Sequence, residues 1–535
     1  MKFNIVNARQ YGVLPNQKIC QKEQLQKLFL DIEDDSMIVF EQGTYQMDCQ
    51  FLIENKKNLT ICGDKTVFVS HYDIQMKVAD TIGMFLFRGC ENLTICDIEV
   101  TTDHPTNTTG RVISKDIEGG TYVFRPLCNA SITGQERIMA QNSFDEELTP
   151  DYHLFCYEKN LYDILENGDI QIHLTEEPQE QLNRLDVGQL VSLRHIVYGK
   201  EFFIFENCSK VKMEDVTVYS SPGPTVRVLP RCSDFAFERF CVKLPEGSDR
   251  LFAANADGIH IKGLTGKLNL KNCYFEHLGD DALNIHSRAA IVTKIDTENK
   301  RISCMSGWER EPLSDNWTDE GDVIEVYNPK EFLVKAKIRV KRFEDGNITY
   351  DTTEGVIEEG DVLANTAYFA SVHVDNCTVK NSRARGILIQ SRDVVIENSY
   401  FEGLSLAGVL ISPDIEYWYE VGPAKNVLIQ NNTFKKCAYA GAVHNMGNIL
   451  VKSSHGSEYE AYPCGVHKNI LIRNNQFIDS PVSAVFVSST EGVKVVENKF
   501  SNCCYEHRNE ELPGSNEVIE LQNCSQVFME NNHEK

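Results

Sequence analysis

The sequence Asn272-Cys-Tyr-Phe-Glu-His-Leu-Gly-Asp-Asp-Ala-Leu-Asn-Ile285 indicates a repeat fold, because four later segments match its pattern without a gap. Its short apolar runs, bounded by Asn, Gly and Asp, are typical of β-strands. A repeat with loops of variable length predicts a parallel β-helix, in which stacked coils share one core and stacked Asn side chains hydrogen-bond along the turns. The four segments are NCTVKNSRARGILI from Asn376, NSYFEGLSLAGVLI from Asn398, NNTFKKCAYAGAVH from Asn431 and NNQFIDSPVSAVFV from Asn474.

The whole chain is predicted to be all-β, a right-handed parallel β-helix with two small antiparallel β-barrel-like insertions. Alternating apolar residues and charged turns interrupt the repeat in both insertions. The second insertion directly follows the acidic part of the repeat, so we expect it to wall that region. The predicted boundaries are N-terminal coils at 1–108, the first insertion at 109–198, the coils with the acidic cluster at 199–288, the second insertion at 289–365 and C-terminal coils at 366–535.

Composition excludes several classes of partner. Among 535 residues, 53 are Lys or Arg and 78 are Asp or Glu, and the resulting net charge of -25 argues against nucleic acid, anionic membrane surfaces and polyanionic substrates. The 18 cysteines are scattered without metal-binding spacing, which indicates reduced thiols. The first residues show no basic and apolar leader pattern, and no apolar run approaches the length of a membrane span. We therefore expect a cytoplasmic location, or secretion if a leader had been removed.

Three acids share this repeat. Asp257-Gly-Ile-His-Ile aligns with Asp281-Ala-Leu-Asn-Ile and with Arg385-Gly-Ile-Leu-Ile, so these three residues are predicted to form a ladder across neighbouring coils. Adjacent strands lie about 4.8 Å apart, close enough for strong coupling between the two carboxylates. Asp280 occupies a mostly apolar position of the repeat and needs its own explanation. The residues aligned with it are Ala384, Leu406, Tyr439 and Val482.

This arrangement suits the hydrolysis of a glycosidic bond. The reaction needs a protonated carboxylic acid at the leaving oxygen and an ionised carboxylate on the other side of the sugar. Repulsion from Asp257 and Asp281 favours the protonated form of Asp280, whereas Arg385 holds one of the other two ionised. We hypothesise that Asp280 is the general acid and that Asp257 and Asp281 activate water, with no metal or cofactor. The alternatives at this point are a solvated turn and a calcium site.

Further polar residues of the repeat are candidate sugar ligands. Arg383, Arg385 and Gln390 belong to the next coil, where they could bind hydroxyl groups or orient an acid, and Arg392 is a weaker candidate. Each arginine could equally be an ordinary surface cation, except that the register of Arg385 favours a role in the site.

Two histidines and one loop complete the candidate site. His260 and His286 flank the acids and could bind substrate, or they could be satisfied histidines within the stack. Trp418 and Glu420 lie in an aromatic and acidic loop that suits stacking on a sugar face with a carboxylate on its hydroxyls, although Trp418 could also be packed structurally.

At these residues the chain resembles glycoside hydrolase family 110, the α-1,3-galactosidases that include enzymes acting on the blood-group B antigen. The likeness lies in Asp257-Gly-Ile-His-Ile-Lys-Gly, in Gly279-Asp-Asp-Ala, and in Asn284-Ile-His286, and it covers mainly residues 200–480. The resemblance implies an exo-acting enzyme that inverts anomeric configuration without a metal. It also implies that Asp280 is the proton donor and that Asp257 and Asp281 activate water.

Other functions stay open at this stage. A polygalacturonase-like hydrolase of a uronic polymer would share the three aspartates, but its Gly-His-Gly and Arg-x-Lys motifs are absent from the expected place, and the net charge disfavours a polyanion. A calcium-dependent lyase could use Arg385 as its base. A non-catalytic carbohydrate-binding β-helix would need only the repeat. The expected partner is a galactoside oligosaccharide or glycan terminus, branched or linear, and two long helices could pair by their flanks as a homodimer.

Overall fold

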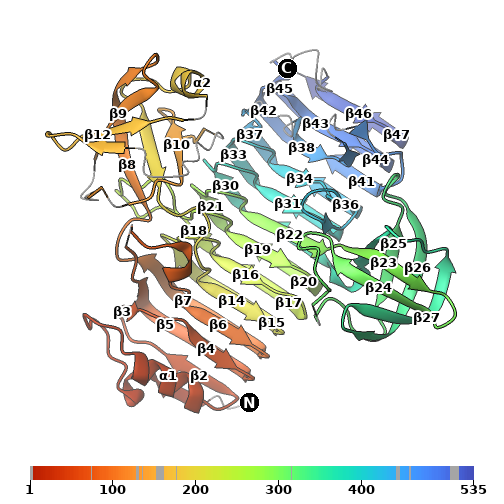
Figure 1. The fold of residues 1–535 in the computed structure, drawn as a ribbon, viewed down its shortest axis with the longest axis horizontal. Helices are drawn as coiled ribbons and strands as arrows, with labels where there is room; N and C mark the ends of the chain where they lie inside the picture. The colour runs from red at the N-terminus through yellow and green to blue at the C-terminus, as the bar shows by residue number, and fades with distance from the viewer. Residues whose placement is uncertain are drawn as a thin grey trace.

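The computed structural model describes residues 4–73, 75–127, 132–134, 136–151, 162–175, 177–314, 316–440, 446–456, 460–505 and 517–534. Figure 1 shows parallel strands stacked coil upon coil from the N-terminus to the C-terminus, with two smaller units projecting from the sides of the stack. The predicted fold class, an all-β parallel β-helix with antiparallel insertions, is confirmed.

Two of the three parallel ladders share the long strands β5, β7 and β15. The first ladder contains β1 (Asn4–Asn7), β2 (Ser36–Val39), β5 (Lys57–Ser70), β7 (Glu91–Thr102), β15 (Ser209–Val218), β17 (Cys232–Glu238), β20 (Leu264–Lys271), β29 (Phe369–Asp375), β32 (Arg392–Glu397), β36 (Lys425–Gln430), β41 (His467–Arg473), β44 (Thr490–Val496) and β47 (Ser525–Glu530). The second adds β3 (Gly43–Met47), β18 (Cys241–Val242), β21 (Tyr274–Glu276), β30 (Thr378–Lys380), β33 (Tyr400–Leu404), β37 (Thr433–Cys437), β42 (Gln476–Ser480), β45 (Lys499–Cys503) and β48 (His533–Glu534).

The third ladder carries the acidic cluster at the turns that enter its strands. Because its strands are short and pair in register, residues just before them also align from coil to coil. The ladder contains β4 (Phe51–Glu54), β6 (Phe85–Arg88), β14 (Phe203–Glu206), β16 (Val226–Val228), β19 (Ile259–Lys262), β22 (Leu283–Arg288), β31 (Ile387–Ile389), β34 (Val409–Ile411), β38 (Gly447–Val451), β43 (Ser483–Ser488) and β46 (Ile519–Gln522).

The asparagine that opens each repeat explains how the chain turns between ladders. All five have φ between 51° and 57°, a left-handed conformation that Asn adopts more readily than most residues. The predicted hydrogen-bonded ladder is confirmed: the Asn376 amide donates to Asn272 (2.7 Å), Asn431 to Asn398 (3.3 Å) and Asn474 to Asn431 (2.7 Å).

A second asparagine ladder lies inside the turn, one residue further along the repeat. Asn432, Asn475 and Asn498 are buried, and the backbone N–H of each donates to the side-chain oxygen of the next, at 2.9–3.1 Å, ending at Asn532. These side chains satisfy backbone groups that the tight turn removes from water.

Stacked apolar side chains fill the space between the ladders. The rings of Phe401, Phe434, Phe477 and Phe500 follow one another with centroids 4.9–5.3 Å apart, so successive coils share one continuous core. The sixteen cysteines among the described residues are free thiols, in line with the sequence.

A helical segment, α1 (Lys22–Asp31), packs Leu25, Leu28 and Phe29 into the first coils. The described part of the chain contains no helix with the length and apolar character needed to cross a membrane.

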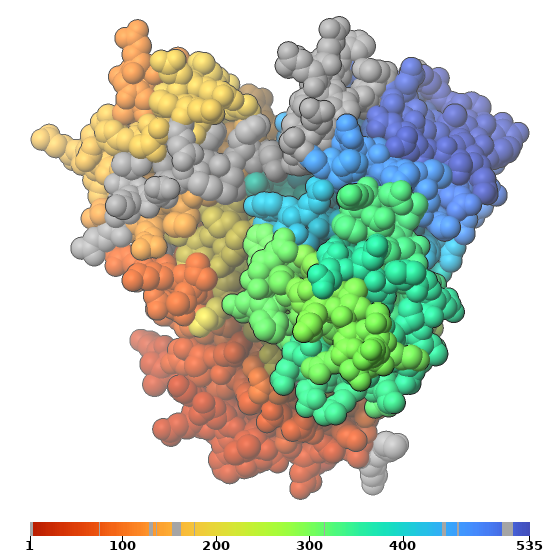
Figure 2. Space-filling model, turned by 45° about the vertical axis from the view of Figure 1, so that its right-hand side comes forward, coloured from red at the N-terminus to blue at the C-terminus, as the bar shows by residue number. Residues whose placement is uncertain are grey.

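The two insertions differ in construction. The first is a six-stranded antiparallel sheet in the order β10-β13-β8-β9-β12-β11, and the second is a closed barrel in the order β23-β24-β27-β26-β25-β28. In Figure 2 the barrel, in green, lies in front of the coils of the β-helix and contacts the blue C-terminal part. The elements are β8 (Asn107–Asp116), β9 (Thr121–Pro126), β10 (Ala140–Phe144), β11 (Tyr162–Ile164), β12 (Ile170–His173), α2 (Pro178–Asn183), β13 (Leu190–Arg194), β23 (Ala290–Asp296), β24 (Arg301–Ser306), β25 (Val323–Tyr327), β26 (Val334–Glu344), β27 (Asn347–Gly355) and β28 (Val362–Asn365).

Candidate active site

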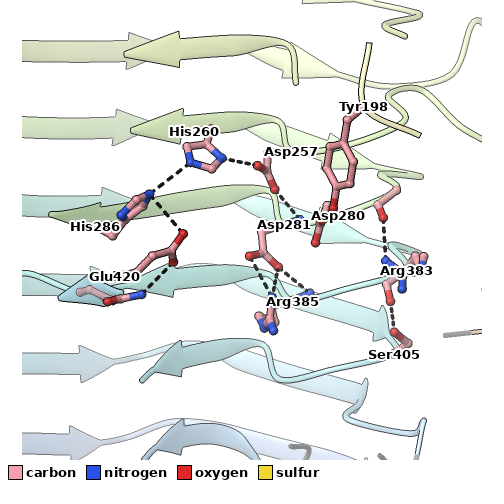
Figure 3. A network of polar contacts seen from close by, with 12 residues as sticks. Tyr198, Asp257, His260, Asp280, Asp281, His286, Arg383, Arg385, Ser405 and Glu420 are labelled. Carbon is pink, nitrogen blue, oxygen red and sulfur yellow. Dashed lines mark hydrogen bonds and ion pairs between the residues drawn. The ribbon is translucent and has the colours of Figure 1, made fainter. Parts of the chain in front are cut away.

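The predicted ladder of two aspartates and an arginine is present on three neighbouring coils. Strands β19, β22 and β31 pair in register, which aligns Asp257, Asp281 and Arg385 two residues before them (Figure 3). The backbone N–H of Asp281 donates to Asp257 Oδ1 at 3.1 Å, and that of Arg385 donates to Asp281 Oδ1 at 3.1 Å. The repeat itself therefore holds the carboxylates in place.

Asp280 joins this ladder from the turn before β22. One carboxylate oxygen from each of Asp257, Asp280 and Asp281 lies within 4.8 Å of the others. Asp257 and Asp281 are buried, whereas Asp280 is partly exposed, which leaves it the more accessible acid. The turn needs a glycine at position 279, because a Cβ there would lie 2.4 Å from a backbone oxygen of the preceding coil.

Burial is the largest influence on the pKa values of Asp257 and Asp281, the two acids of the ladder. It raises the pKa of Asp257 well above its ordinary value, helped by the charge of Asp280. Burial also raises the pKa of Asp281 to about 7, although the guanidinium of Arg385 opposes this shift from 3.2 Å. The predicted Arg385–carboxylate contact is thus present, but it only partly offsets the burial that disfavours the charged form.

A chain of polar side chains extends from Asp257 along the same face (Figure 3). Asp257 Oδ2 lies 2.6 Å from His260 Nδ1, and His260 Nε2 lies 3.2 Å from His286 Nε2. His286 Nε2 is 3.4 Å from Glu420 Oε1, and the amide of Gln390 donates to Glu420 Oε2 at 3.2 Å. Burial lowers the pKa of His260 and brings that of His286 to about 4, so both imidazoles are neutral at pH 7.

These side chains offer ligand atoms for a cation as well as for hydroxyl groups. His260, His286 and Glu420 present three such atoms within 4.8 Å of one another, next to the three acids. In the acid set, however, Arg385 already contacts both oxygens of Asp281, at 3.3 and 3.2 Å.

Two residues of the site lie outside the sequence prediction. Tyr198, at the exit of the first insertion, donates its hydroxyl hydrogen to Asp280 Oδ2. Arg227 in β16 is in register with His260. Its positive charge opposes the rise in the pKa of Asp257 that burial causes. Extending the repeat one coil towards the N-terminus would have revealed Arg227, whereas no repeat signal marks Tyr198.

The remaining candidates have structural partners. Arg383 Nη1 donates to the backbone oxygen of Gly279 at 3.2 Å and so supports the turn that carries Asp280. Arg392 binds the buried Glu325 and lies 4.4 Å from the centre of the Phe369 ring, which accounts for it without a sugar.

The aromatic side chain expected to stack on a sugar lies in the loop before Glu420. Trp418 is 54% exposed and stacks on Trp308 of the barrel rather than on any residue of the acid cluster.

Comparison with known proteins supports the fold and points to a class of enzyme. A model described as a right-handed β-helix region matches residues 362–533. The chain is similar to an α-1,3-galactosidase A of Bacteroides fragilis, with 30% identity over 302 residues covering 54% of this chain and 48% of the relative. It is also similar to an α-1,3-galactosidase B of Bacteroides thetaiotaomicron, with 25% identity over 530 residues covering 92% of this chain and 82% of the relative.

The share of each relative's length that matches this chain differs between the relatives. The chain spans about half the length of the two Bacteroides fragilis proteins, 48% and 56%. A solved exopolygalacturonase of Thermotoga maritima aligns over 99% of this chain and 92% of its own, at 11% identity and a TM-score of 0.47.

Proposed function

We propose that the protein is an exo-acting glycoside hydrolase of family 110 that removes terminal α-1,3-linked galactose from a glycan. The observation that carries this proposal is the convergence of three carboxylates on adjacent coils, within reach of one sugar, with an arginine and a tyrosine bound to them. The names of the curated relatives support the sugar and the linkage.

The proposed roles follow the exposure of the three acids. Asp280, the most accessible, gives its proton to the glycosidic oxygen as the bond to the anomeric carbon breaks. A water molecule between Asp257 and Asp281 attacks that carbon and passes its proton to the carboxylate pair. The contact of Asp281 with Arg385 favours its ionised form, which is the form a base requires.

We infer inversion of configuration from the surroundings of the buried pair. A spacing within 4.8 Å is closer than the roughly 6.5–9.5 Å usual for inverting enzymes and nearer the roughly 5–5.5 Å of retaining ones. However, both oxygens of Asp257 and both of Asp281 are already in contact with protein groups, and both side chains are buried. A water molecule can reach such oxygens more easily than an anomeric carbon can, so direct nucleophilic attack is disfavoured.

The proposal does not need a metal. Arg385 already supplies a positive charge at Asp281, which a cation would otherwise have to provide. The neutral imidazoles of His260 and His286, together with Glu420 and Gln390, can instead hold the hydroxyl groups of galactose.

A substrate panel tests the proposal. Galactosyl-α-1,3-galactose, with and without a neighbouring fucose, is compared with α-1,4- and α-1,6-galactosides and with polygalacturonate, each with and without a chelator. We expect free galactose from the α-1,3 substrates alone, unchanged by chelation. Release of galacturonate would instead indicate a polygalacturonase, and complete loss of activity with chelator would overturn the metal-independent mechanism.

The variant Asp280→Asn tests the acid within the same experiment. Removal of a general acid typically costs ~10²–10⁴-fold in rate, and we expect a loss of that size in kcat while calorimetric binding of the galactoside is retained. Asp393→Asn is the matched control, because Asp393 is exposed on another ladder and binds only a neighbouring asparagine amide among its described contacts. Full turnover by Asp280→Asn would refute the assignment of the acid.

A further inference from the structure

Three exposed aromatic rings gather where the barrel meets the loop before Glu420. Trp308 and Trp418 stack with centroids 4.9 Å apart and planes 24° apart, and Tyr417 stands edge-on to Trp418 at 4.7 Å. Their exposed fractions are 50%, 54% and 63%. The chain has only three tryptophans, and the third, Trp317, is buried. Large exposed aromatic patches on soluble proteins commonly mark binding surfaces.

Contacts within the loop and across to the barrel fix this group of rings. The carboxylate of Asp414 accepts three consecutive backbone N–H groups, the last from Trp418 at 3.0 Å. Arg310 of the barrel donates to the hydroxyl of Tyr419 at 2.6 Å and lies 4.9 Å from its ring centre. A Cβ at Gly307 would lie 2.2 Å from the Tyr419 ring, so a glycine is needed for this close approach.

The rings adjoin the candidate active site. Trp418 precedes Glu420 by two residues, a separation of at most ~7 Å along the chain. Glu420 belongs to β35 (Glu420–Val421), which pairs antiparallel with the end of β22, and its carboxylate contacts His286. The aromatic group therefore lies at the end of the polar chain that leads from the three acids.

We propose that Trp308, Trp418 and Tyr417 form a stacking subsite for the neutral part of the glycan beyond its terminal galactose. The proposal rests on the proposed function. Flat aromatic faces suit the apolar faces of pyranose rings, and a fixed pair of stacked indoles loses little conformational entropy on binding. A net charge of -25 disfavours an anionic membrane or an acidic polymer as the occupant, so a neutral oligosaccharide fits best. The barrel would then contribute to substrate specificity.

The test compares two substrates with the same galactose terminus, a disaccharide and a neutral oligosaccharide longer by three sugars. For Trp308→Ala we expect KM for the long substrate to rise about 2–13-fold, as the loss of aromatic contacts worth ~0.5–1.5 kcal/mol predicts at ~1.4 kcal/mol per tenfold change, with KM for the disaccharide unchanged. Phe528→Ala is the control, because Phe528 is similarly exposed at 48% but lies in the C-terminal coils. A second readout is tryptophan fluorescence on titration with the long oligosaccharide from which the galactose has been removed; we expect quenching in the wild type and little in Trp308→Ala.

The outcomes distinguish failure of the proposed subsite from failure of the proposed hydrolase function. An equal rise in KM for both substrates, or no rise for either together with unaltered fluorescence, would overturn the subsite. Binding of the wild type to phosphatidylcholine vesicles that disappears in Trp308→Ala would also overturn it, in favour of a membrane-facing surface. Absence of galactose release from any substrate, with fluorescence quenching intact, would overturn the proposed function and leave the glycan subsite standing.

Discussion

Asp281 experiences two opposing influences, and their balance sets the pH range of the proposed reaction. Burial disfavours its charge and Arg385 favours it, with a resulting pKa of about 7. As the pH falls below this value, the folded protein binds a proton that inactivates the base. Activity should therefore decline on the acid side of neutrality.

Arg385→Gln tests this balance. Loss of the guanidinium removes the influence that lowers the pKa of Asp281, so this pKa should rise and the acid limb of kcat/KM should move to higher pH. The measurement is a profile of kcat/KM between pH 5 and 9, with Arg231→Gln as a control in which an exposed ion pair with Asp319 is lost. An acid limb that stays in place in Arg385→Gln would show that Asp281 does not control it.

For individual residues, the alignment of the repeats determines which site residues can be predicted from the sequence. Asp257, Asp281 and Arg385 could be placed together because they occupy one position of a repeat whose strands pair without slipping. Tyr198 could not be placed, because it comes from the end of an insertion with no repeat to align it. Trp418 was expected near the site, but its partner Trp308 depends on how the barrel packs, which no local pattern encodes.

At the element scale, the asparagine ladders account for the regularity of the coils. The outer ladder is exposed and its residues satisfy a left-handed turn, whereas the inner ladder is buried and completes backbone hydrogen bonds. In the sequence, the two ladders appear as consecutive Asn residues, for example Asn474 and Asn475. Only the structure shows that the first Asn of such a pair is exposed and the second is buried.

Asn475→Ala tests the inner ladder. Asn475 accepts the backbone N–H of Asn432 and donates to the backbone oxygen of Ile429, so its loss leaves buried groups unpaired. At ~1–3 kcal/mol for an unsatisfied buried group, we expect the free energy of unfolding to fall by about 2–4 kcal/mol, read from urea unfolding. Asn474→Gly, which keeps the left-handed turn and removes one exposed bond, should cost clearly less. Equal losses in the two variants would contradict separate roles for the ladders.

At the scale of the whole molecule, the two insertions border the same site. The exit of the first brings Tyr198 to Asp280, and the barrel brings Trp308 to Trp418. The sequence predicted that the second insertion would wall the site but did not predict the contribution of the first. Insertions pack against the helix through side chains that follow no repeat, and so their contacts emerge only from the three-dimensional structure.

In the proposed mechanism, a water molecule held by Asp257 and Asp281 attacks the anomeric carbon of the terminal galactose while Asp280 protonates the departing glycosidic oxygen. Proton NMR of the methyl β-glycoside of galactosyl-α-1,3-galactose during the first minutes of hydrolysis tests this mechanism most directly. The methyl group fixes the anomeric centre of the second sugar, so the free galactose comes from the terminal residue alone and its first anomer is visible before mutarotation. We expect β-galactose as the first product, because inversion at an α-linked sugar releases the β-anomer. First release of α-galactose would contradict the assigned water-activating pair, and no release of galactose would contradict the proposed hydrolase itself.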